Sequence, residues 1–257
     1  MRRLLMMMLL LGLSLAPESR AAGSIVDLEL VLAVDASGSV DDAEYKLQLA
    51  GIASSFRDPA VRRAIRSGPA GAIAVNLLVW AEPQVPKDTT GWFIIASDGD
   101  AEKFARNVEA FPRRQTGATA IGEGIASALR SLEANNIEAV REVVDVSGDG
   151  RESVARDFTV LVGQARAMAV GRGVVINGLA IENEVADLAD YYRGNVQSGP
   201  GSFVMAVKAY EDFGEAMRRK LLREIEYRPR VTRLLPLSGG GQQAPPDGLS
   251  TRFRPSD

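Results

Sequence analysis

The sequence predicts a doubly wound α/β fold, in which a mostly parallel central sheet carries helices on both faces. Apolar runs of strand length, such as residues 72–80 and 173–181, alternate along the chain with segments whose apolar residues recur at helical spacing. The runs are apolar almost throughout, as expected for strands buried on both faces of a parallel sheet. This alternation predicts right-handed crossovers between parallel strands. The 257 residues are enough for one well-buried domain of this class.

The chain begins with a segment typical of a signal peptide. Met1-Arg2-Arg3 is basic, and residues 4–15 are almost entirely apolar but too short to cross a bilayer comfortably. Ser19-Arg20-Ala21 places small residues at the two positions that determine cleavage. We therefore predict a signal peptide over residues 1–21 and an exported protein, periplasmic or secreted, with no membrane span after cleavage. The alternative is a retained N-terminal anchor.

The first predicted strand, residues 25–34, leads into the turn Asp35-Ala36-Ser37-Gly38-Ser39. A helix follows, because acidic residues stand in its first turn and the next apolar residues recur at helical spacing. These apolar residues are Tyr45, Leu49, Ile52 and Phe56. The helix is predicted to end near Asp58-Pro59, since a residue that precedes proline disfavours helical backbone. The turn thus lies at the carboxyl end of a strand, where open α/β sheets bind ligands.

The remaining elements continue the alternation. Further strands are predicted at 72–80, 92–95, 173–181 and 202–207, with 92–95 at an edge of the sheet. Further helices are predicted from about residue 100 to Pro112, over 121–133, through Val154, Phe158, Leu161, Ala165 and Met168, and over 210–225. The last helix carries a group of basic residues near its carboxyl end, which we interpret as a solvated face that complements the helix dipole. These residues are Arg218, Arg219, Lys220 and Arg223.

Two later segments differ from this pattern. Residues 182–201 are polar and Gly-rich, and we expect them to return toward the carboxyl edge of the sheet. Within them Tyr191 and Tyr192 either pack under the loop, which we favour, or form an exposed binding surface. From Pro229 onward the chain is rich in Pro, Gly and Gln and lacks the apolar periodicity of a core. We therefore predict a folded domain over 22–228 and a disordered tail over 229–257.

The composition excludes several classes of function. The sequence has no histidine, which removes the commonest general base, every Ser-His or Cys-His nucleophile and the usual zinc ligand. The formal net charge is −3, and loss of residues 1–21, with three Arg and one Glu, would make it −5. No basic field then replaces counterions on phosphates, so nucleic acid is not the expected partner. The absence of cysteine is compatible with a bacterial periplasm in which no disulfide is used.

The turn after the first strand has the chemistry of a site for a divalent cation. In an extended backbone Asp35, Ser37 and Ser39 point the same way, so one carboxylate and two hydroxyls face a common point. Oxygen ligands suit a hard cation, and Mg2+ commonly keeps waters and takes few carboxylates from the protein. A site of such low charge leaves the cation electrophilic. The alternative is an ordinary turn in which the Asp and Ser side chains cap the following helix.

The pattern Asp35-x-Ser37-x-Ser39 resembles the metal-ion-dependent adhesion site of von Willebrand factor A-type domains, in which DxSxS is followed by a downstream Thr and a downstream Asp. The loop Gly117-Ala118-Thr119-Ala120-Ile121-Gly122 is similar to the family's loop before a helix and puts Thr119 in the third position. Residues 143–150, Val-Val-Asp-Val-Ser-Gly-Asp-Gly, resemble the strand before the fourth position and put Asp149 there. The resemblance covers about residues 25–227. The last two motifs also resemble a family of exported bacterial proteins of this type whose function is unknown.

Four positions leave alternatives open. Gly148 stands where the family usually has Thr. Asp145 interrupts a strand that is normally apolar, and is either an acceptor behind the metal ligands, which we favour slightly, or a partly exposed strand residue. Thr116 lies in the same loop as Thr119, and sequence spacing does not separate the two. Glu123 is interpreted as a surface acid that complements a helix dipole rather than as a metal ligand.

The resemblance implies that Mg2+, with Mn2+ or Ca2+ as alternatives, is bound by Asp35, Ser37, Ser39, Thr119 and Asp149. A Glu or Asp carboxylate of a protein partner would complete the octahedron, which predicts metal-dependent protein binding rather than catalysis. One alternative is a metal-dependent hydrolase, which needs a base or a second metal. Asp98, Asp100 and Asp149 are the only acids at predicted strand ends that would serve. Another alternative is a scaffold whose site is vestigial.

Overall fold

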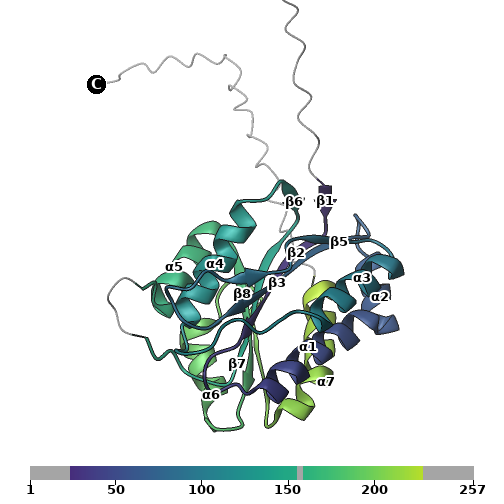
Figure 1. Ribbon diagram of the computed structural model, residues 1–257. Helices are drawn as coiled ribbons and strands as arrows, with labels where there is room; N and C mark the ends of the chain where they lie inside the picture. The colour runs from purple at the N-terminus through teal and green to yellow at the C-terminus, as the bar shows by residue number, and fades with distance from the viewer. Residues whose placement is uncertain (1–23, 155–158, 228–257) are drawn as a thin grey trace, which may run out of the picture. The chain divides into compact units, whose positions relative to one another are not determined.

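The computed structural model describes residues 24–154 and 159–227, so the predicted signal peptide and C-terminal tail lie outside the described residues. The central sheet has seven strands: β2 (Leu28–Asp35), β3 (Ile73–Trp80), β4 (Asp88–Thr89), β5 (Phe93–Ile95), β7 (Glu142–Gly148), β8 (Val175–Ile181) and β9 (Val204–Val207). Their order is β4-β3-β2-β7-β8-β9, and β5 also pairs with β3 (Figure 1). Strands β3, β2, β7, β8 and β9 pair in parallel, whereas β4 and β5 run antiparallel to β3. The predicted α/β fold with a mostly parallel sheet is confirmed.

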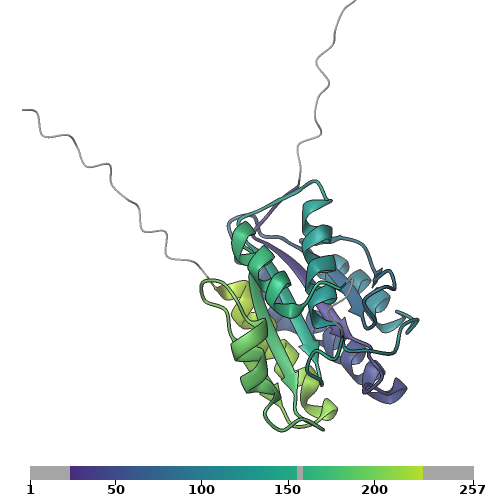
Figure 2. The same ribbon diagram turned by 90° about the vertical axis from the view of Figure 1, so that its left-hand side faces the viewer.

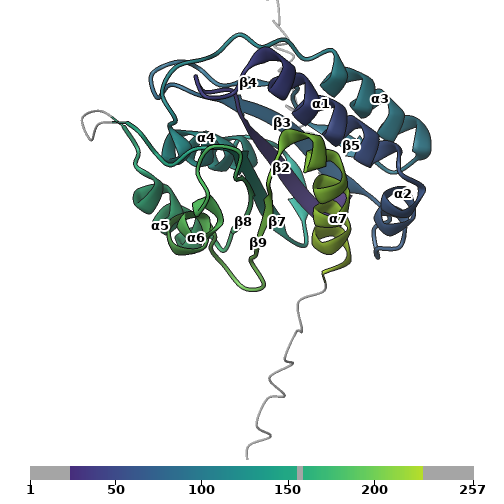
Figure 3. The same ribbon diagram turned by 90° about the horizontal axis from the view of Figure 1, so that it is seen from below.

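Helices cover both faces of this sheet, as predicted (Figure 3). One face carries α1 (Asp42–Arg57), α2 (Pro59–Arg66), α3 (Asp98–Glu109) and α7 (Phe213–Glu226). The other carries α4 (Ile121–Glu133), α5 (Val162–Arg172) and α6 (Leu188–Tyr191), which continues into a π-helical turn over Tyr192–Val196. A 3-10 turn over Tyr210–Asp212 precedes α7. None of the helices in these residues has the length and apolar character needed to cross a membrane.

The strands in the middle of the sheet run in parallel (Figure 2), so the polar residues that follow them come to one edge of the sheet from distant parts of the sequence. Along β2, Leu30, Leu32 and Val34 pack under the helices of one face, and Val31 and Ala33 under those of the other. Since β2 and β7 are parallel neighbours, the chain leaves both strands at the same edge. The loops that follow these two strands therefore lie side by side.

The first predicted strand, 25–34, is interrupted. Residues Ser24–Val26 form β1, which pairs in parallel with β6 (Ile137–Ala139) in a separate two-stranded sheet. The break falls at Asp27, whose carboxylate accepts hydrogen bonds from the amides of Ala70 (3.0 Å) and Gly71 (2.9 Å). The Asp27 side chain thus binds the amides of the turn before β3, and the strand that was predicted as continuous is broken at this residue.

The first helix ends where it was predicted to end, but the helix after it was missed, and a later helix begins at another residue than predicted. Where one helix was expected to end, a second begins at once: Pro59 takes the first position of α2, and Asp58 accepts hydrogen bonds from two amides of its first turn. The helix predicted through Val154 begins only at Val162, and Phe158 lies outside the described residues. Glu152 explains the delay, because its carboxylate accepts hydrogen bonds from the amides of both Gly122 and Val162. The same carboxylate therefore holds the start of α5 against the start of α4.

This contact between α4 and the start of α5 requires glycine at position 122. A Cβ on Gly122 would overlap the backbone of residues 160–162, so Gly122→Ala is expected to lower the free energy of unfolding by about 1–3 kcal/mol. Gly163 is the matched control, because a Cβ there meets open space and Gly163→Ala should raise the same free energy by up to about 1 kcal/mol. Urea denaturation measures both. Similar effects of the two substitutions would contradict this packing.

Candidate metal centre

The turn after β2 is fixed by hydrogen bonds to its own backbone. Asp35 and Ser37 are fully buried, whereas Ser39 is exposed. The amide of Ser37 donates a hydrogen bond to Asp35 Oδ1 (2.7 Å), and Gln48 Nε2 donates one to the Asp35 carbonyl (3.1 Å). This arrangement leaves the Oγ atoms of Ser37 and Ser39 3.3 Å apart. The three predicted residues of the turn therefore lie together.

Asp149, which follows β7, joins this turn. Ser39 Oγ donates a hydrogen bond to Asp149 Oδ1 (2.7 Å), and the Tyr210 hydroxyl donates one to Asp149 Oδ2 (3.0 Å). Asp149 is itself buried. Both oxygens of this carboxylate are thus held in place, one by a residue of the turn and one by the start of the last helical segment.

Thr119 comes from the loop before α4. Its amide donates a hydrogen bond to Ser153 Oγ (3.0 Å), and the Ser153 amide donates one to the Thr119 carbonyl (3.0 Å). A Cβ on Gly150 would lie 3.4 Å from Thr119 Oγ1, so the buried Thr119 hydroxyl stands beside the residue after Asp149. Thr116, its rival in the same loop, is exposed.

Arg113 holds the turn from outside. Its Nη2 lies 3.2 Å from the carbonyl oxygen of Ala36 and 3.1 Å from that of Ser37, and also donates a hydrogen bond to the Val40 carbonyl. Its Nη1 donates a hydrogen bond to Asp42 (2.7 Å) at the start of α1. One guanidinium group therefore connects several carbonyls of a turn that has no regular secondary structure to satisfy them.

The electrostatics of the centre favour an added positive charge. Burial, and next to it the charge of Asp149, raise the pKa of Asp35 from 3.8 to about 7, against the lowering effect of hydrogen bonds with Ser37. Asp35 Oδ2 is buried and accepts no hydrogen bond within the described residues. Two buried carboxylates that repel each other, with one oxygen unpaired, are stabilised by a cation between them. The residues present therefore fit a divalent metal ion.

The donor set is entirely oxygen, which suits Mg2+, Mn2+ or Ca2+ rather than a soft metal. Residues 24–154 and 159–227 contain no group of three or more His, Cys, Asp or Glu placed to bind a metal, so a cation here would depend on the hydroxyls. Glu123 does not belong to the set. Its Oε1 accepts a hydrogen bond from the Val160 amide (2.7 Å) and its side chain is 12% exposed, so it is a mostly buried acid rather than the predicted surface one.

Tyr192 explains why glycine replaces threonine at position 148. A Cβ on Gly148 would lie 2.7 Å from Asp35 Oδ2 and 2.8 Å from the Tyr192 hydroxyl, so a threonine side chain would not fit. Burial and the charges of Asp35 and Asp149 raise the pKa of Tyr192 well above its ordinary value, which keeps its hydroxyl protonated. Tyr192 is fully buried, so the favoured prediction that it packs under the loop is confirmed for this residue.

Of the three acids considered for hydrolysis, Asp149 belongs to the centre, whereas Asp98 and Asp100 lie away from it. Because β5 runs antiparallel to β3, its carboxyl end is at the opposite edge of the sheet from Asp35. Asp98 forms an ion pair with Arg66. Asp100 belongs to the capping box of α3, in which it accepts hydrogen bonds from Ser97. Both acids therefore have structural partners at the amino end of α3.

Asp145 belongs to a different cluster, and both predictions for it were wrong. It is 1% exposed, and Lys220 Nζ of α7 lies 2.6 Å from its Oδ1. Lys220 also donates a hydrogen bond to Glu224 Oε1 (2.9 Å), which accepts another from Asn177 Nδ2 (2.7 Å). Lys220 is fully buried, so its assignment to a solvated face was wrong as well. We call Asp145, Lys220 and Glu224 the α7 charge cluster.

Several residues around the centre were not identified from the sequence. Arg113 and Tyr210 reach it from a loop and a helix start that are distant in the chain, and no local pattern marks them as part of it. Tyr192 was expected near this edge of the sheet, but not its close approach to position 148. Gln48 did carry a signal, because it lies three residues after Tyr45 on the apolar side of the predicted helix and is fully buried. A polar side chain at such a position needs a hydrogen-bond partner, which here is the Asp35 carbonyl.

Comparison with solved structures identifies the fold as that of von Willebrand factor A-type domains. The chain resembles the vWF domain of the type V pili tip protein Mfa5 from Porphyromonas gingivalis, with a TM-score of 0.55 at 9% identity over 80% of this chain and 98% of that one. It resembles the pilus adhesin SpaC from Lactobacillus rhamnosus GG, with a TM-score of 0.56 at 13% identity over 78% of this chain and 31% of that one. The likeness at these identities concerns the fold alone.

A third similar structure is proximal thread matrix protein 1 from the mussel byssus, described with a zinc-occupied MIDAS motif. The TM-score is 0.55 at 17% identity over 79% of this chain and 47% of that one. The chain thus spans about a third of the pilus adhesin and about half of the mussel protein. No curated protein matches it. Residues 25–229 match the model of a family described as protein of unknown function, DUF1194, and because this match covers most of the sequence, the chain belongs to the DUF1194 family.

Proposed function

We propose that the protein is an exported, metal-dependent protein-binding module. In this proposal Asp35, Ser37, Ser39, Thr119 and Asp149 bind Mg2+, or Mn2+ or Ca2+ in its place, and an acidic residue of a protein partner binds to the same ion. The observation that carries the proposal is the pair of buried carboxylates, Asp35 and Asp149, with serine hydroxyls beside them and one Asp35 oxygen unpaired. The absence of histidine and the distant positions of Asp98 and Asp100 favour binding over hydrolysis.

The residues of the centre divide into two groups. Asp35, Ser37 and Asp149 are buried and fixed by hydrogen bonds, whereas Ser39 is exposed. The ion, when bound, would supply an electrophilic position for a carboxylate. A partner would approach from the side of Ser39, because Ser39 is the exposed residue of the set whereas Asp35 and the neighbouring Tyr192 are fully buried. The hydrogen bonds that Gln48 and Arg113 donate to carbonyl oxygens of the turn would keep its conformation fixed when the partner binds.

Thermal unfolding of the purified protein with EDTA, and with millimolar Mg2+ or Mn2+, tests the metal site. Binding to the native state alone stabilises it by RT ln(1 + [L]/Kd), which is about 2.7 kcal/mol at a hundredfold excess over Kd. We expect the metal to raise the melting temperature of the wild type but not of a Ser37→Ala, Ser39→Ala double variant. Thr119→Ala should weaken the effect, and Thr116→Ala is its matched control, expected to behave like the wild type.

The outcomes separate the alternatives. A metal effect that survives the double serine substitution would place the ion elsewhere and contradict the proposal. A metal effect that is confined to the wild type, together with partner binding that EDTA does not weaken, would keep the site but refute the bridging role of the ion. Loss of partner binding in both EDTA and the double variant is the result expected for a metal-dependent module.

A further inference from the structure

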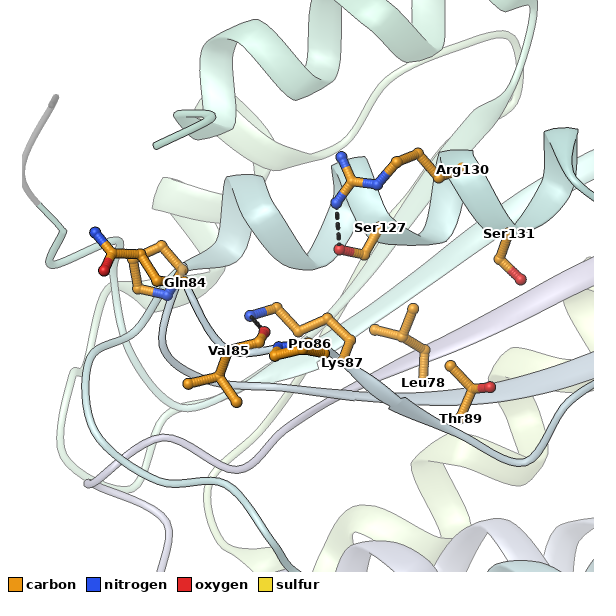
Figure 4. Close-up of a pocket in the computed structure, with 10 residues that line it drawn as sticks. Leu78, Gln84, Val85, Pro86, Lys87, Thr89, Ser127, Arg130 and Ser131 are labelled. Carbon is orange, nitrogen blue, oxygen red and sulfur yellow. Dashed lines mark hydrogen bonds between the residues drawn. The ribbon is translucent and has the colours of Figure 1, made fainter. Parts of the chain in front are cut away.

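A pocket of about 490 Å3 lies between α4 and the loop that follows β3. Ser127, Arg130 and Ser131 of α4 line one side, and residues 83–87 line the other (Figure 4). Its volume is within the range of small-molecule sites, about 300–1,000 Å3. Apolar side chains of Leu78, Pro83, Val85 and Pro86 form part of its wall. The pocket therefore combines apolar surface with two basic residues, Lys87 and Arg130.

Lys87 is a partly buried cation without a carboxylate partner. Its ammonium donates hydrogen bonds to the carbonyl oxygens of Glu82 and of Val85 (2.9 Å). In the described part of the chain no carboxylate forms an ion pair with it. An ammonium has three N–H donors, so one remains after these two bonds. Burial lowers the pKa of Lys87, and so does the charge of Arg130, against the raising effect of the charges of Glu123 and Glu82.

Arg130 faces the same space from α4. Its Nη2 donates a hydrogen bond to Ser127 Oγ (2.7 Å), which lies between the guanidinium and the loop (Figure 4). Arg130 forms a long ion pair with Glu123, whose Oε2 lies 3.7 Å from Nη2. That distance is too long for a hydrogen bond, and the other oxygen of Glu123 already accepts one from Val160. Most donors of the guanidinium therefore remain available to a ligand.

We propose that this pocket binds a carboxylate attached to an apolar group of about the size of one aromatic side chain. Lys87 and Arg130 bind the carboxylate, Ser127 orients Arg130, and the apolar group lies against Val85, Pro86 and Leu78. The carboxylate belongs either to a free small acid or to the C-terminus of a peptide, and the chemistry is the same for both. The site needs no metal ion, because none of its lining residues belongs to the proposed metal centre.

Protein-detected NMR titration in EDTA tests this site independently of the metal. The probes are 3-phenylpropionate and its neutral analogue 3-phenylpropanol, and the peptide acetyl-Gly-Gly-Phe with a free or an amidated C-terminus. Saturable shifts confined to residues 78–89 and 123–131 are expected with the two acids and not with the two neutral compounds. The tighter of the two acids identifies the source, a free acid or a chain terminus. Equal binding of acids and neutral analogues would overturn the proposal.

Two substitutions and a control complete the test. Lys87→Gln and Arg130→Gln should each weaken binding of the acids by about tenfold, since each removes a hydrogen bond between charged groups. Arg106→Gln is the control, because Arg106 is an exposed arginine of α3 outside the pocket, and it should leave binding unchanged. Unchanged affinity in both pocket variants, with native spectra, would overturn the assignment. Because EDTA is present throughout, failure here leaves the metal-dependent function untouched.

Discussion

Replacement of Lys220 by Met is expected to lower the free energy of unfolding by about 3–5 kcal/mol at pH 8. Lys220 is fully buried and lies 2.6 Å from Asp145 Oδ1 and 2.9 Å from Glu224 Oε1. Met nearly preserves the length of the side chain, so little packing is lost. What changes is the charge, because two buried carboxylates lose the only cation of the α7 charge cluster. Urea denaturation at fixed pH measures the difference.

This loss should depend on pH in a defined direction. Burial, and then the charge of Glu224, raise the pKa of Asp145 from 3.8 to about 7, even though Lys220 lowers it. An acid with a raised folded-state pKa favours the native state in its protonated form. Its contribution is therefore fully present below the unfolded pKa and is lost as the pH rises through 7. Without Lys220 the pKa rises further, so the loss in Lys220→Met should be smaller at pH 5 than at pH 8.

Arg219→Met provides the control on the same helix. Arg219 is 57% exposed and its Nε lies 3.7 Å from Glu215, and exposed ion pairs of this kind contribute about 0–1 kcal/mol. The two variants remove the same charge from adjacent positions of α7. A similar loss in both, or a loss in Lys220→Met that does not change between pH 5 and pH 8, would show that burial of the cluster does not control its energetics.

The sequence contained a signal for this cluster that we interpreted incorrectly. Phe213, Met217, Lys220 and Glu224 follow one another at spacings of four, three and four residues, which places them on one side of a helix. We assigned Lys220 to a solvated face because basic residues near the carboxyl end of a helix complement its dipole. Asp145 posed the same problem in β7, where its neighbours are apolar. Opposite charges at inward positions of two elements together predict a buried ion pair, because each charge lowers the free-energy cost of burying the other.

The candidate metal centre was predictable where it depends on topology. Parallel strands that leave the sheet at one edge bring Asp35 and Asp149 together whatever the details of the loops, and the helix that starts at Ile121 fixes the position of Thr119. The contacts of Tyr192, Tyr210 and Arg113 depend on loop conformations, which no periodic pattern encodes. The short strands β4 and β6 were missed because their two or three residues show neither an alternation nor an apolar run, and β1 was predicted as part of one strand with β2.

Replacement of Asp35 by Asn is expected to stabilise the metal-free protein at pH 8, by about 2–4 kcal/mol. The folded-state pKa of Asp35, about 7, lies above its ordinary value of 3.8, so the wild type loses stability as the pH rises between these values. Asn has the same shape, keeps an oxygen that accepts the hydrogen bond of the Ser37 amide, and does not repel Asp149. Urea denaturation in EDTA from pH 5 to pH 8 measures the difference between variant and wild type.

The same comparison distinguishes Asp35 from other acids that titrate in this range. Burial also raises the pKa of Glu29 to about 7, and with Asp145 it contributes to the pH dependence of both proteins equally. The difference between Asp35→Asn and the wild type therefore isolates Asp35. It should be clearly smaller at pH 5 than at pH 8 and approach its full value above pH 7. Destabilisation of the variant at pH 8 would mean that the carboxylate supports the turn and does not strain it.

Addition of Mg2+ should then reverse the advantage of the variant. The ion compensates the charge of Asp35 in the wild type, and the stability gained grows with its concentration as RT ln(1 + [L]/Kd). The variant lacks that charge, so Mg2+ should affect it little. An equal response of both proteins to Mg2+ would exclude Asp35 as a ligand. The Asp35 carboxylate would then destabilise the metal-free fold and stabilise the metal-bound one. Such a cost in stability is expected of a residue whose role is to bind a ligand rather than to support folding.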